Sequence, residues 1–159
     1  SELLQLFFSR VSSIKSFELI GDTSSKRIGS ISFNLKGLHY NLVVRLLNDR
    51  FGIQARGGWS CASTFAQYYF ALSKSDAELL CKRIDEGNFT GKPGWVRISL
   101  HPIMKDEEVC FIINALSEIE SKGDDWGKEY RYNKNNNEFE PLGDRDKINL
   151  HGLFNLDTH

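Results

Sequence analysis

The sequence is short of cysteine, has no excess of charge of either sign and lacks a long apolar run. Its three cysteines, Cys61, Cys81 and Cys110, are an odd number at wide spacing, which fits neither a disulfide framework nor a zinc-binding pattern. We therefore expect a reduced, cytoplasmic setting, with Cys81 and Cys110 in the core because both fall on apolar helical stripes. The net charge is −1 over 159 residues, so the charge favours neither nucleic acid nor an anionic membrane as a partner. No stretch predicts a transmembrane helix, and no secretory signal is evident.

The remaining composition is that of a globular domain. Hydrophobic residues make up 40% of the chain and charged residues 26%, a usual balance for a folded protein, and the length is sufficient for one domain with its own core. The sequence begins at Ser1 within an apparent helix, and Met104 is its single methionine. These two features lead us to expect a part of a longer protein.

The spacing of apolar residues predicts five helices and four strands. Helices are expected over 2–14, 40–51, 62–72, 75–87 and from 106 onward, and strands over 17–20, 30–35, 53–56 and 95–100. Short strands interleaved with helices predict the α+β class, with a small mixed or antiparallel sheet covered by helices. We expect residues 1–122 to form this domain, and residues 123–159 to be a weakly patterned C-terminal extension that can pack on it.

The loop after the third expected strand has the composition of a ligand-binding loop. Arg56 ends the strand, Gly57 and Gly58 follow, and Cys61 stands near the start of the next helix. Glycines at such a turn let the backbone approach a ligand closely, and arginine binds carboxylates and phosphates well. A thiol near a cation and a helix N-terminus can have a lowered pKa, but Cys61 can equally be a small buried apolar residue.

Arg97 is the second candidate for anion binding. It lies mid-strand, on the face opposite Val96 and Ile98. A strand arginine is more often a solvent-exposed charge, although Trp95 on the same face favours some cover. The residues by themselves thus predict a modest site, in which an anionic small molecule lies between Arg56 and Arg97.

Four segments in this order carry a resemblance to a known family. They are Ile31–Gly37, Gly52–Ala62, Gly94–His101 and Asp106–Val109. Together they resemble the C-terminal domain of class V aminotransferase-like enzymes, which are fold type I enzymes that use pyridoxal 5′-phosphate (PLP) and include cysteine desulfurases and selenocysteine lyases. The resemblance extends over roughly residues 1–122.

The resemblance implies that this chain is the small domain of a larger PLP-dependent enzyme. In the family, a preceding large domain carries the lysine that binds PLP covalently, and no segment here resembles that domain. The isolated chain is therefore expected to be inactive and to bind no PLP covalently. The parent protein is expected to be a homodimeric, PLP-dependent aminotransferase, desulfurase or lyase that acts on a small amino acid.

The resemblance also implies roles for single residues. Arg97 takes the position of the strand arginine that binds the substrate α-carboxylate, and Arg56 takes that of a second substrate contact. Cys61 takes the position of the loop cysteine that accepts sulfur in desulfurases. The residues expected to line the same site are Asn34, Gly57, Gly58, Trp59 and Ser60.

Two features depart from the desulfurase pattern. Trp59 and Ser60 stand where desulfurases commonly carry histidines, and the segment from Cys61 to Arg97 is longer than theirs. Both features are more similar to a less characterised aminotransferase branch. Two alternatives remain: a stand-alone, non-catalytic binding or interaction module with the same fold, and an unrelated α+β domain, in which Arg56 and Arg97 would lie far apart.

Overall fold

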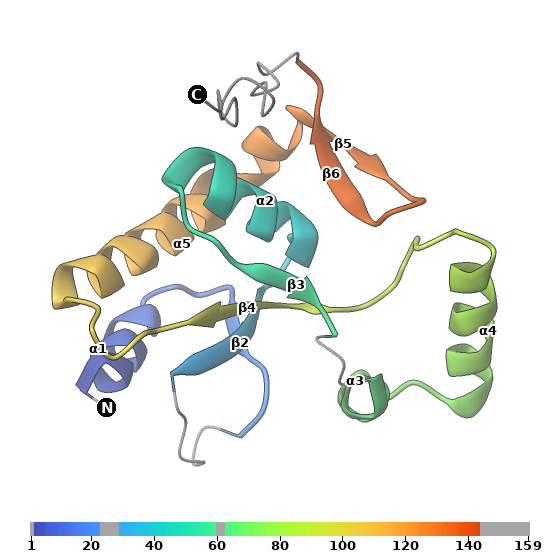
Figure 1. Cartoon of the computed structure of the whole chain (residues 1–159), viewed down its shortest axis with the longest axis horizontal. Helices are drawn as coiled ribbons and strands as arrows, with labels where there is room; N and C mark the ends of the chain where they lie inside the picture. Colours follow the sequence, from blue (N-terminus) through green and yellow to red (C-terminus); the bar gives the residue numbers. More distant parts are fainter. Residues whose placement is uncertain (1, 23–28, 60–62, 144–159) are drawn as a thin grey trace, which may run out of the picture.

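The computed structural model describes residues 2–22, 29–59 and 63–143 and shows a four-stranded sheet with three helices on one face and a short helix at one end of the other (Figure 1). The elements are α1 (Glu2–Val11), β1 (Phe17–Leu19), β2 (Ser30–Leu35), α2 (Tyr40–Phe51), β3 (Arg56–Gly58), α3 (Ser63–Tyr69), α4 (Lys74–Asp85), β4 (Trp95–Ser99), α5 (Asp106–Gly127), β5 (Tyr130–Asn133) and β6 (Glu138–Pro141). The strand order is β1-β2-β4-β3, and each neighbouring pair is antiparallel. The predicted α+β class with a small antiparallel sheet is confirmed.

Strict alternation in the two central strands determines which face of the sheet is covered. Ile31, Phe33 and Leu35 of β2 are fully buried, as are Val96 and Ile98 of β4. Successive strand residues point to opposite faces, so these side chains form one continuous apolar surface. Helices α1, α2 and α5 pack together over that surface, and their apolar stripes complete the main core.

Local signals predict where α2 begins and ends and where α5 begins. His39 is the N-cap of α2, and its side chain accepts a hydrogen bond from the backbone N–H of Asn41. Gly52 ends α2 in the left-handed conformation at φ 66°, which glycine adopts without strain. At the start of α5, the Glu108 carboxylate accepts a hydrogen bond of 2.8 Å from the backbone N–H of Lys105. The five residues predicted for the inner stripe of α5 are all buried: Val109, Ile112, Ile113, Leu116 and Ile119.

Strand β3 and the segment between β3 and β4 differ from the secondary structure and burial that the sequence predicts. The short strand lies at Arg56–Gly58 rather than over 53–56. Helix α4 begins after Ser73, whose hydroxyl accepts a hydrogen bond from the backbone N–H of Asp76, and it spans Lys74–Asp85 rather than 75–87. Cys81 is exposed rather than in the core, because α4 stands beside the sheet and buries only Leu80 (Figure 1). Cys110, the other cysteine on a predicted apolar stripe, lies in α5 and is half-buried.

The C-terminal part holds a hairpin that the sequence pattern did not reveal. Helix α5 runs unbroken through residue 122, the expected end of the domain, as far as Gly127. Strands β5 and β6 then pair in antiparallel fashion, with Asn133 opposite Glu138 at the turn. The hairpin packs against α2, where the Asn41 side-chain amide donates to the backbone carbonyl of Asn137. Residues 130–141 are therefore part of the folded unit.

The C-terminal ends of α2 and α5 are joined by an ion pair and a cation–π contact, both made by Arg50. The Arg50 guanidinium at the end of α2 pairs with Glu129 and lies 4.2 Å from the centre of the Trp126 ring. Partly exposed pairs of this kind add about 0–1 kcal/mol each. Within the described part of the chain, no helix has both the length and the apolar composition needed to cross a membrane.

Candidate functional site

The face of the sheet opposite α1, α2 and α5 carries both candidate arginines. At one end of this face α3 covers the buried Trp95, and the rest, here called the open face, is polar. The register places Ser32 of β2 opposite Arg97 of β4, and Arg97 opposite Arg56 of β3. Residues directly opposite one another in paired strands point to the same face, so these three side chains form a row across the sheet. Helices α1, α2 and α5 lie on the other face. The row is therefore open for a ligand or for another part of the protein.

Arg56 and Arg97 share one hollow. It has a volume of about 590 Å³ and is lined by Asn48, Gln54, Ala55, Arg56, Arg97 and Ser99. Like charges directly opposite each other in a sheet are destabilising, and neither guanidinium forms an ion pair within the described residues. An anion placed between the arginines would remove this repulsion. Their adjacency contradicts the separation that the unrelated-domain alternative predicts.

A tyrosine wedged between two glycines sets the spacing of the arginine strands. A Cβ added at Gly94 would lie 2.5 Å from Cζ of Tyr40, and one added at Gly57 would lie 2.1 Å from Oδ1 of Asn41 and 3.1 Å from Cδ2 of Tyr40. The two shortest distances are below van der Waals contact, so only glycine lets Tyr40 and Asn41 lie this close to the two strands. Gly57 follows Arg56, and Gly94 begins the segment that leads to Arg97, so the Tyr40 ring packs beside the backbone that carries both arginines.

The hairpin holds that tyrosine from the other side. The Asn137 side-chain amide donates to the Tyr40 hydroxyl, and its oxygen accepts from the Tyr132 hydroxyl at 2.9 Å. Asn137 is buried and has a positive φ of 62°, a conformation that asparagine tolerates better than most residues. Sequence analysis missed both Tyr40 and Asn137, because no local pattern connects residues 97 positions apart.

The remaining predicted site residues are only partly brought together. Asn34 lies on the same face as the arginines, and its amide donates to the backbone carbonyl of Gly94 at 3.0 Å. Gly57, Gly58 and Trp59 line a different cavity, beside α2 and the hairpin. Ser60 and Cys61 lie outside the described residues.

Comparison with known proteins agrees with this architecture. The family model described as aminotransferase class-V matches residues 1–111. The chain belongs to the class-V aminotransferase family. Its members are PLP-dependent enzymes, and the membership predicted from the four segments is confirmed.

A solved structure shows the same fold for most of the chain. The apo structure of a cysteine desulfurase from Thermococcus onnurineus NA1 matches with a TM-score of 0.55 and 22% sequence identity. The match covers 76% of this chain but only 24% of that desulfurase, so this chain corresponds to about a quarter of its length. A search of curated proteins gave no match. The hairpin lies beyond the residues that the class-V model matches.

His39 lies at the contact between α2 and the hairpin. Its ring stacks on Tyr40 at 4.5 Å between ring centres and contacts the rings of Tyr132 and Phe139. Burial lowers the pKa of His39 below its ordinary value of 6.5. Nδ1 accepts the α2 capping hydrogen bond from Asn41 at 3.1 Å, so protonation of this nitrogen would remove the cap.

This shift predicts a loss of stability in mild acid. Because the folded protein binds the His39 proton less readily than the unfolded chain, the free energy of unfolding falls as the pH drops below about 6.5. We expect a lower melting temperature at pH 5.5 than at pH 7.5. His39→Asn keeps a capping side chain and should flatten this dependence. An unchanged slope in that variant would assign the effect to other groups.

Among the described residues, no group of three or more His, Cys, Asp or Glu side chains is placed to hold a metal ion. The arginine hollow is instead suited to an organic anion. Guanidinium groups bind carboxylates through two parallel hydrogen bonds, and Ser99 adds a hydroxyl at the edge of the hollow.

Proposed function

We propose that this chain is the substrate-side domain of a PLP-dependent enzyme acting on a small amino acid. The observation that carries the proposal is the pair of opposed arginines on the open face, Arg56 and Arg97, without a carboxylate partner in the described part of the chain. In this proposal Arg97 binds the substrate α-carboxylate with both arms of its guanidinium, and Arg56 contributes a second contact. The amino acid is thereby oriented for reaction.

The lining of the hollow fits a substrate carboxylate but does not fit covalent attachment of PLP. Its six lining residues include no lysine, and covalent attachment of PLP requires an amine. When bound to the whole protein, PLP supplies the electron sink for reactions at the amino-acid α-carbon. We assign that attachment to a part of the protein beyond this chain, and we propose that the open polar face turns toward it.

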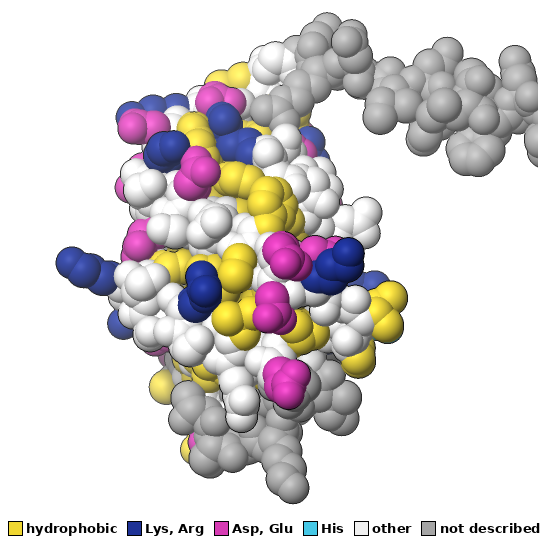
Figure 2. Space-filling model, turned by 90° about the vertical axis from the view of Figure 1, so that its left-hand side faces the viewer, with side chains coloured by type: hydrophobic (Ala, Val, Ile, Leu, Met, Phe, Trp, Pro, Cys, Tyr) yellow, Lys and Arg dark blue, Asp and Glu magenta, His cyan; other side chains and the backbone are white. Residues whose placement is uncertain are grey.

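An apolar hollow on another side of the domain supports a larger assembly. Figure 2 looks at the side where α1 and the start of α5 lie, and shows apolar side chains in patches between charged ones. A hollow of about 420 Å³ has Phe51, Ile53, Met104 and Phe111 among its lining residues, and Ile103 beside it is 83% exposed. Exposed apolar clusters often mark contact surfaces. We propose that the rest of a homodimeric parent enzyme covers part of this side.

The proposal is tested with the full-length protein and PLP. Addition of small amino acids, among them alanine and cysteine, should change the PLP absorbance spectrum, and the isolated 159-residue chain should show no PLP band that borohydride fixes to it. With cysteine and a thiol reductant, formation of alanine together with sulfide released by reduction of the persulfide identifies desulfuration, whereas formation of a keto acid with transfer of the amino group identifies transamination. A full-length protein that responds to no amino acid would favour the non-catalytic module.

Within this proposal, sulfur from cysteine is accepted either by Cys61 or by another group. If Cys61 accepts sulfur, Cys61→Ala should lose the persulfide formed on the protein while it keeps the spectral response to cysteine, because the arginines still bind the carboxylate. Cys110→Ala, which changes a half-buried cysteine of α5, is the matched control and should retain the persulfide. Retention of the persulfide in Cys61→Ala would assign sulfur acceptance to another group.

A further inference from the structure

The cavity enclosed by α2, β3, the loop before β4 and the hairpin has no role in the proposed reaction. Its volume is about 480 Å³, and its lining includes Asn41, Trp59, Phe89, Lys92 and Glu138. We propose that this cavity is a second binding site, for a free zwitterionic amino acid with an aromatic or large apolar side chain. The argument depends on how the walls are held, on the charges and on the aromatic lining.

Hydrogen bonds between separate segments hold the walls in place. The backbone N–H of Phe89 donates to the carbonyl of Lys134 in the hairpin turn at 2.8 Å. The Trp59 indole N–H donates to the carbonyl of Pro93, and Asn41 of α2 donates to the hairpin backbone. Each bond joins two different walls, so the cavity exists before a ligand binds. A preformed cavity avoids the entropic cost of ordering its walls on binding.

Two opposite charges at the cavity, Lys92 and Glu138, form no ion pair with any residue that the structure describes. The Lys92 ammonium lies 5.3 Å from the centre of the Trp59 ring and 5.2 Å from that of Phe89. The rings favour a cation there, but within the described chain Lys92 forms no ion pair. The Glu138 carboxylate likewise has neither an ion pair nor a hydrogen bond there. A third charge at the cavity, Arg45, is already paired with Asp49 at 2.9 Å.

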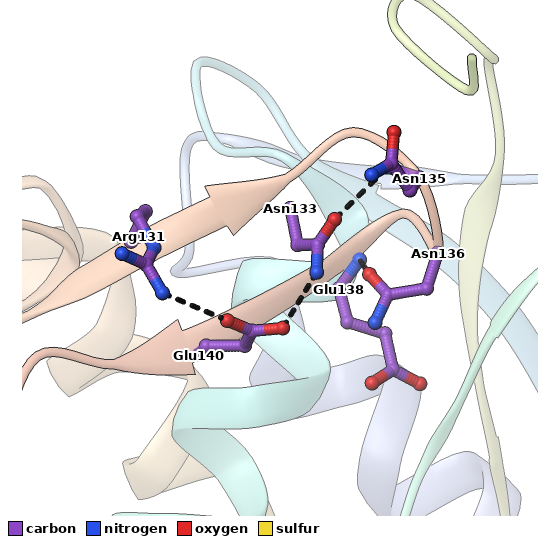
Figure 3. Close-up of polar contacts among 6 residues, drawn as sticks. All are labelled: Arg131, Asn133, Asn135, Asn136, Glu138 and Glu140. Carbon is purple, nitrogen blue, oxygen red and sulfur yellow. Dashed lines mark hydrogen bonds and ion pairs between the residues drawn. The ribbon is translucent and has the colours of Figure 1, made fainter. Parts of the chain in front are cut away.

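The hairpin contacts explain why Glu138 stays free. Its neighbour Glu140 accepts hydrogen bonds from Asn133 at 2.7 Å and from Arg131 at 3.3 Å. In Figure 3 the Glu138 carboxylate points away from these contacts, and its backbone N–H donates to the Asn136 side chain. Glu138 and Glu140 are two positions apart and lie on the same side of β6, but the Arg131 and Asn133 side chains are engaged by Glu140. Glu138 is thus available to a ligand at the cavity.

The combination of unpaired charges and aromatic walls selects the ligand class. A carboxylate can bind Lys92 and an ammonium group can bind Glu138, which together describe a zwitterion. The rings of Trp59 and Phe89 offer apolar surface to a large side chain. Side-chain amides at 41 and 136 add polar groups to the cavity lining. Simple anions or cations would leave one of the two charges without a partner.

This site is distinct from the arginine hollow, although Asn48 lines both. The hollow is lined by Arg56 and Arg97, the cavity by the residues that follow Arg56 in β3. Glu138 stands in the hairpin, beyond the residues matched by the class-V family model. The inference does not depend on the reaction proposed above and can be tested on the 159-residue chain without PLP.

The test is a titration of the chain with l-phenylalanine, followed by calorimetry and by ¹H–¹⁵N NMR. We expect saturable shifts of the Trp59 indole and of the Asn41 and Asn137 side-chain amides. Lys92→Gln and Glu138→Gln should each weaken binding about tenfold or more, the effect of losing one charged contact. 3-Phenylpropionate, 2-phenylethylamine and glycine should also bind at least about tenfold more weakly, because each lacks one of the three features.

Matched variants separate this site from the surface and from the proposed substrate site. Lys134→Gln in the hairpin turn and Glu86→Gln at the end of α4 remove exposed charges outside the cavity lining and should leave the affinity unchanged. The double variant Arg56→Gln/Arg97→Gln should also bind l-phenylalanine normally, even if it loses the proposed substrate. The inference is overturned by absence of saturable binding, by equal binding of 3-phenylpropionate, or by shifts confined to the arginine hollow.

Discussion

Phe33→Ala is expected to lower the free energy of unfolding by about 3–5 kcal/mol, the usual cost of removing a buried aromatic ring. Phe33 has no exposed surface and lies in β2, which is paired on both sides by β1 and β4. Its ring stacks on Phe17 at 5.0 Å between centres. Since neighbouring strands prevent the backbone from closing the space, alanine would leave a cavity in the core. Urea denaturation should show a lower midpoint with an unchanged slope.

Phe111→Ala is the matched control for this loss. Phe111 is 49% exposed on α5, so the same change of side chain should cost about 1 kcal/mol or less. Similar losses in both variants would mean that the sheet face around Phe33 is less tightly packed than its burial indicates. A reduced denaturation slope in Phe33→Ala would indicate that the variant no longer unfolds in a single cooperative step.

Arg97→Gln is expected to weaken substrate binding by about 30–150-fold, which corresponds to the 2–3 kcal/mol of a lost charged hydrogen-bonded contact. The measurement is the KM of the full-length enzyme for its amino-acid substrate. Arg97→Lys keeps the charge but loses the planar fork, so its KM should lie between those of the wild type and Arg97→Gln. In the free chain, Arg97→Gln should not lower the melting temperature, because it removes the repulsion between Arg97 and Arg56.

A raised KM without a lower melting temperature would distinguish a substrate-binding role of Arg97 from a structural one. Arg10→Gln changes an exposed arginine of α1, away from the open face, and should alter neither KM nor melting temperature. If Arg97→Gln lowered the melting temperature and left KM unchanged, Arg97 would be a structural residue of the sheet. If Arg56→Gln raised the KM and Arg97→Gln did not, the substrate carboxylate would be bound by Arg56 of β3 instead.

Local signals in the sequence were sufficient for most helices and for the central strands. The apolar stripe and the terminal Gly52 predicted α2 with the bounds that the structure has. Alternation in 30–35 and 95–99 predicted which side chains face the main core, whereas Trp95 on the other face is buried because α3 packs on it. These features depend on residues one to four positions apart, so a single sequence contains the information. The same alternation placed Arg97 on the polar face.

Weak local signals accounted for the errors. The hairpin strands β5 and β6 have four residues each, too few for a clear alternation, and their polar residues are stabilised by contacts with α2. Cys81 lies on an apolar stripe of α4, yet it is exposed because no second layer covers that helix. Burial depends on what packs against an element, which periodicity does not specify.

By itself, the sequence determined the family, the α+β class and the two arginines worth testing. Only the tertiary structure decided that Arg56 and Arg97 are direct cross-strand neighbours, because strand register depends on pairing between segments far apart in the chain. It also decided that a C-terminal hairpin holds Tyr40 against the strands of both arginines. The loop that begins at Arg56 thus lines two sites, the arginine hollow on the open face and the cavity beside the hairpin.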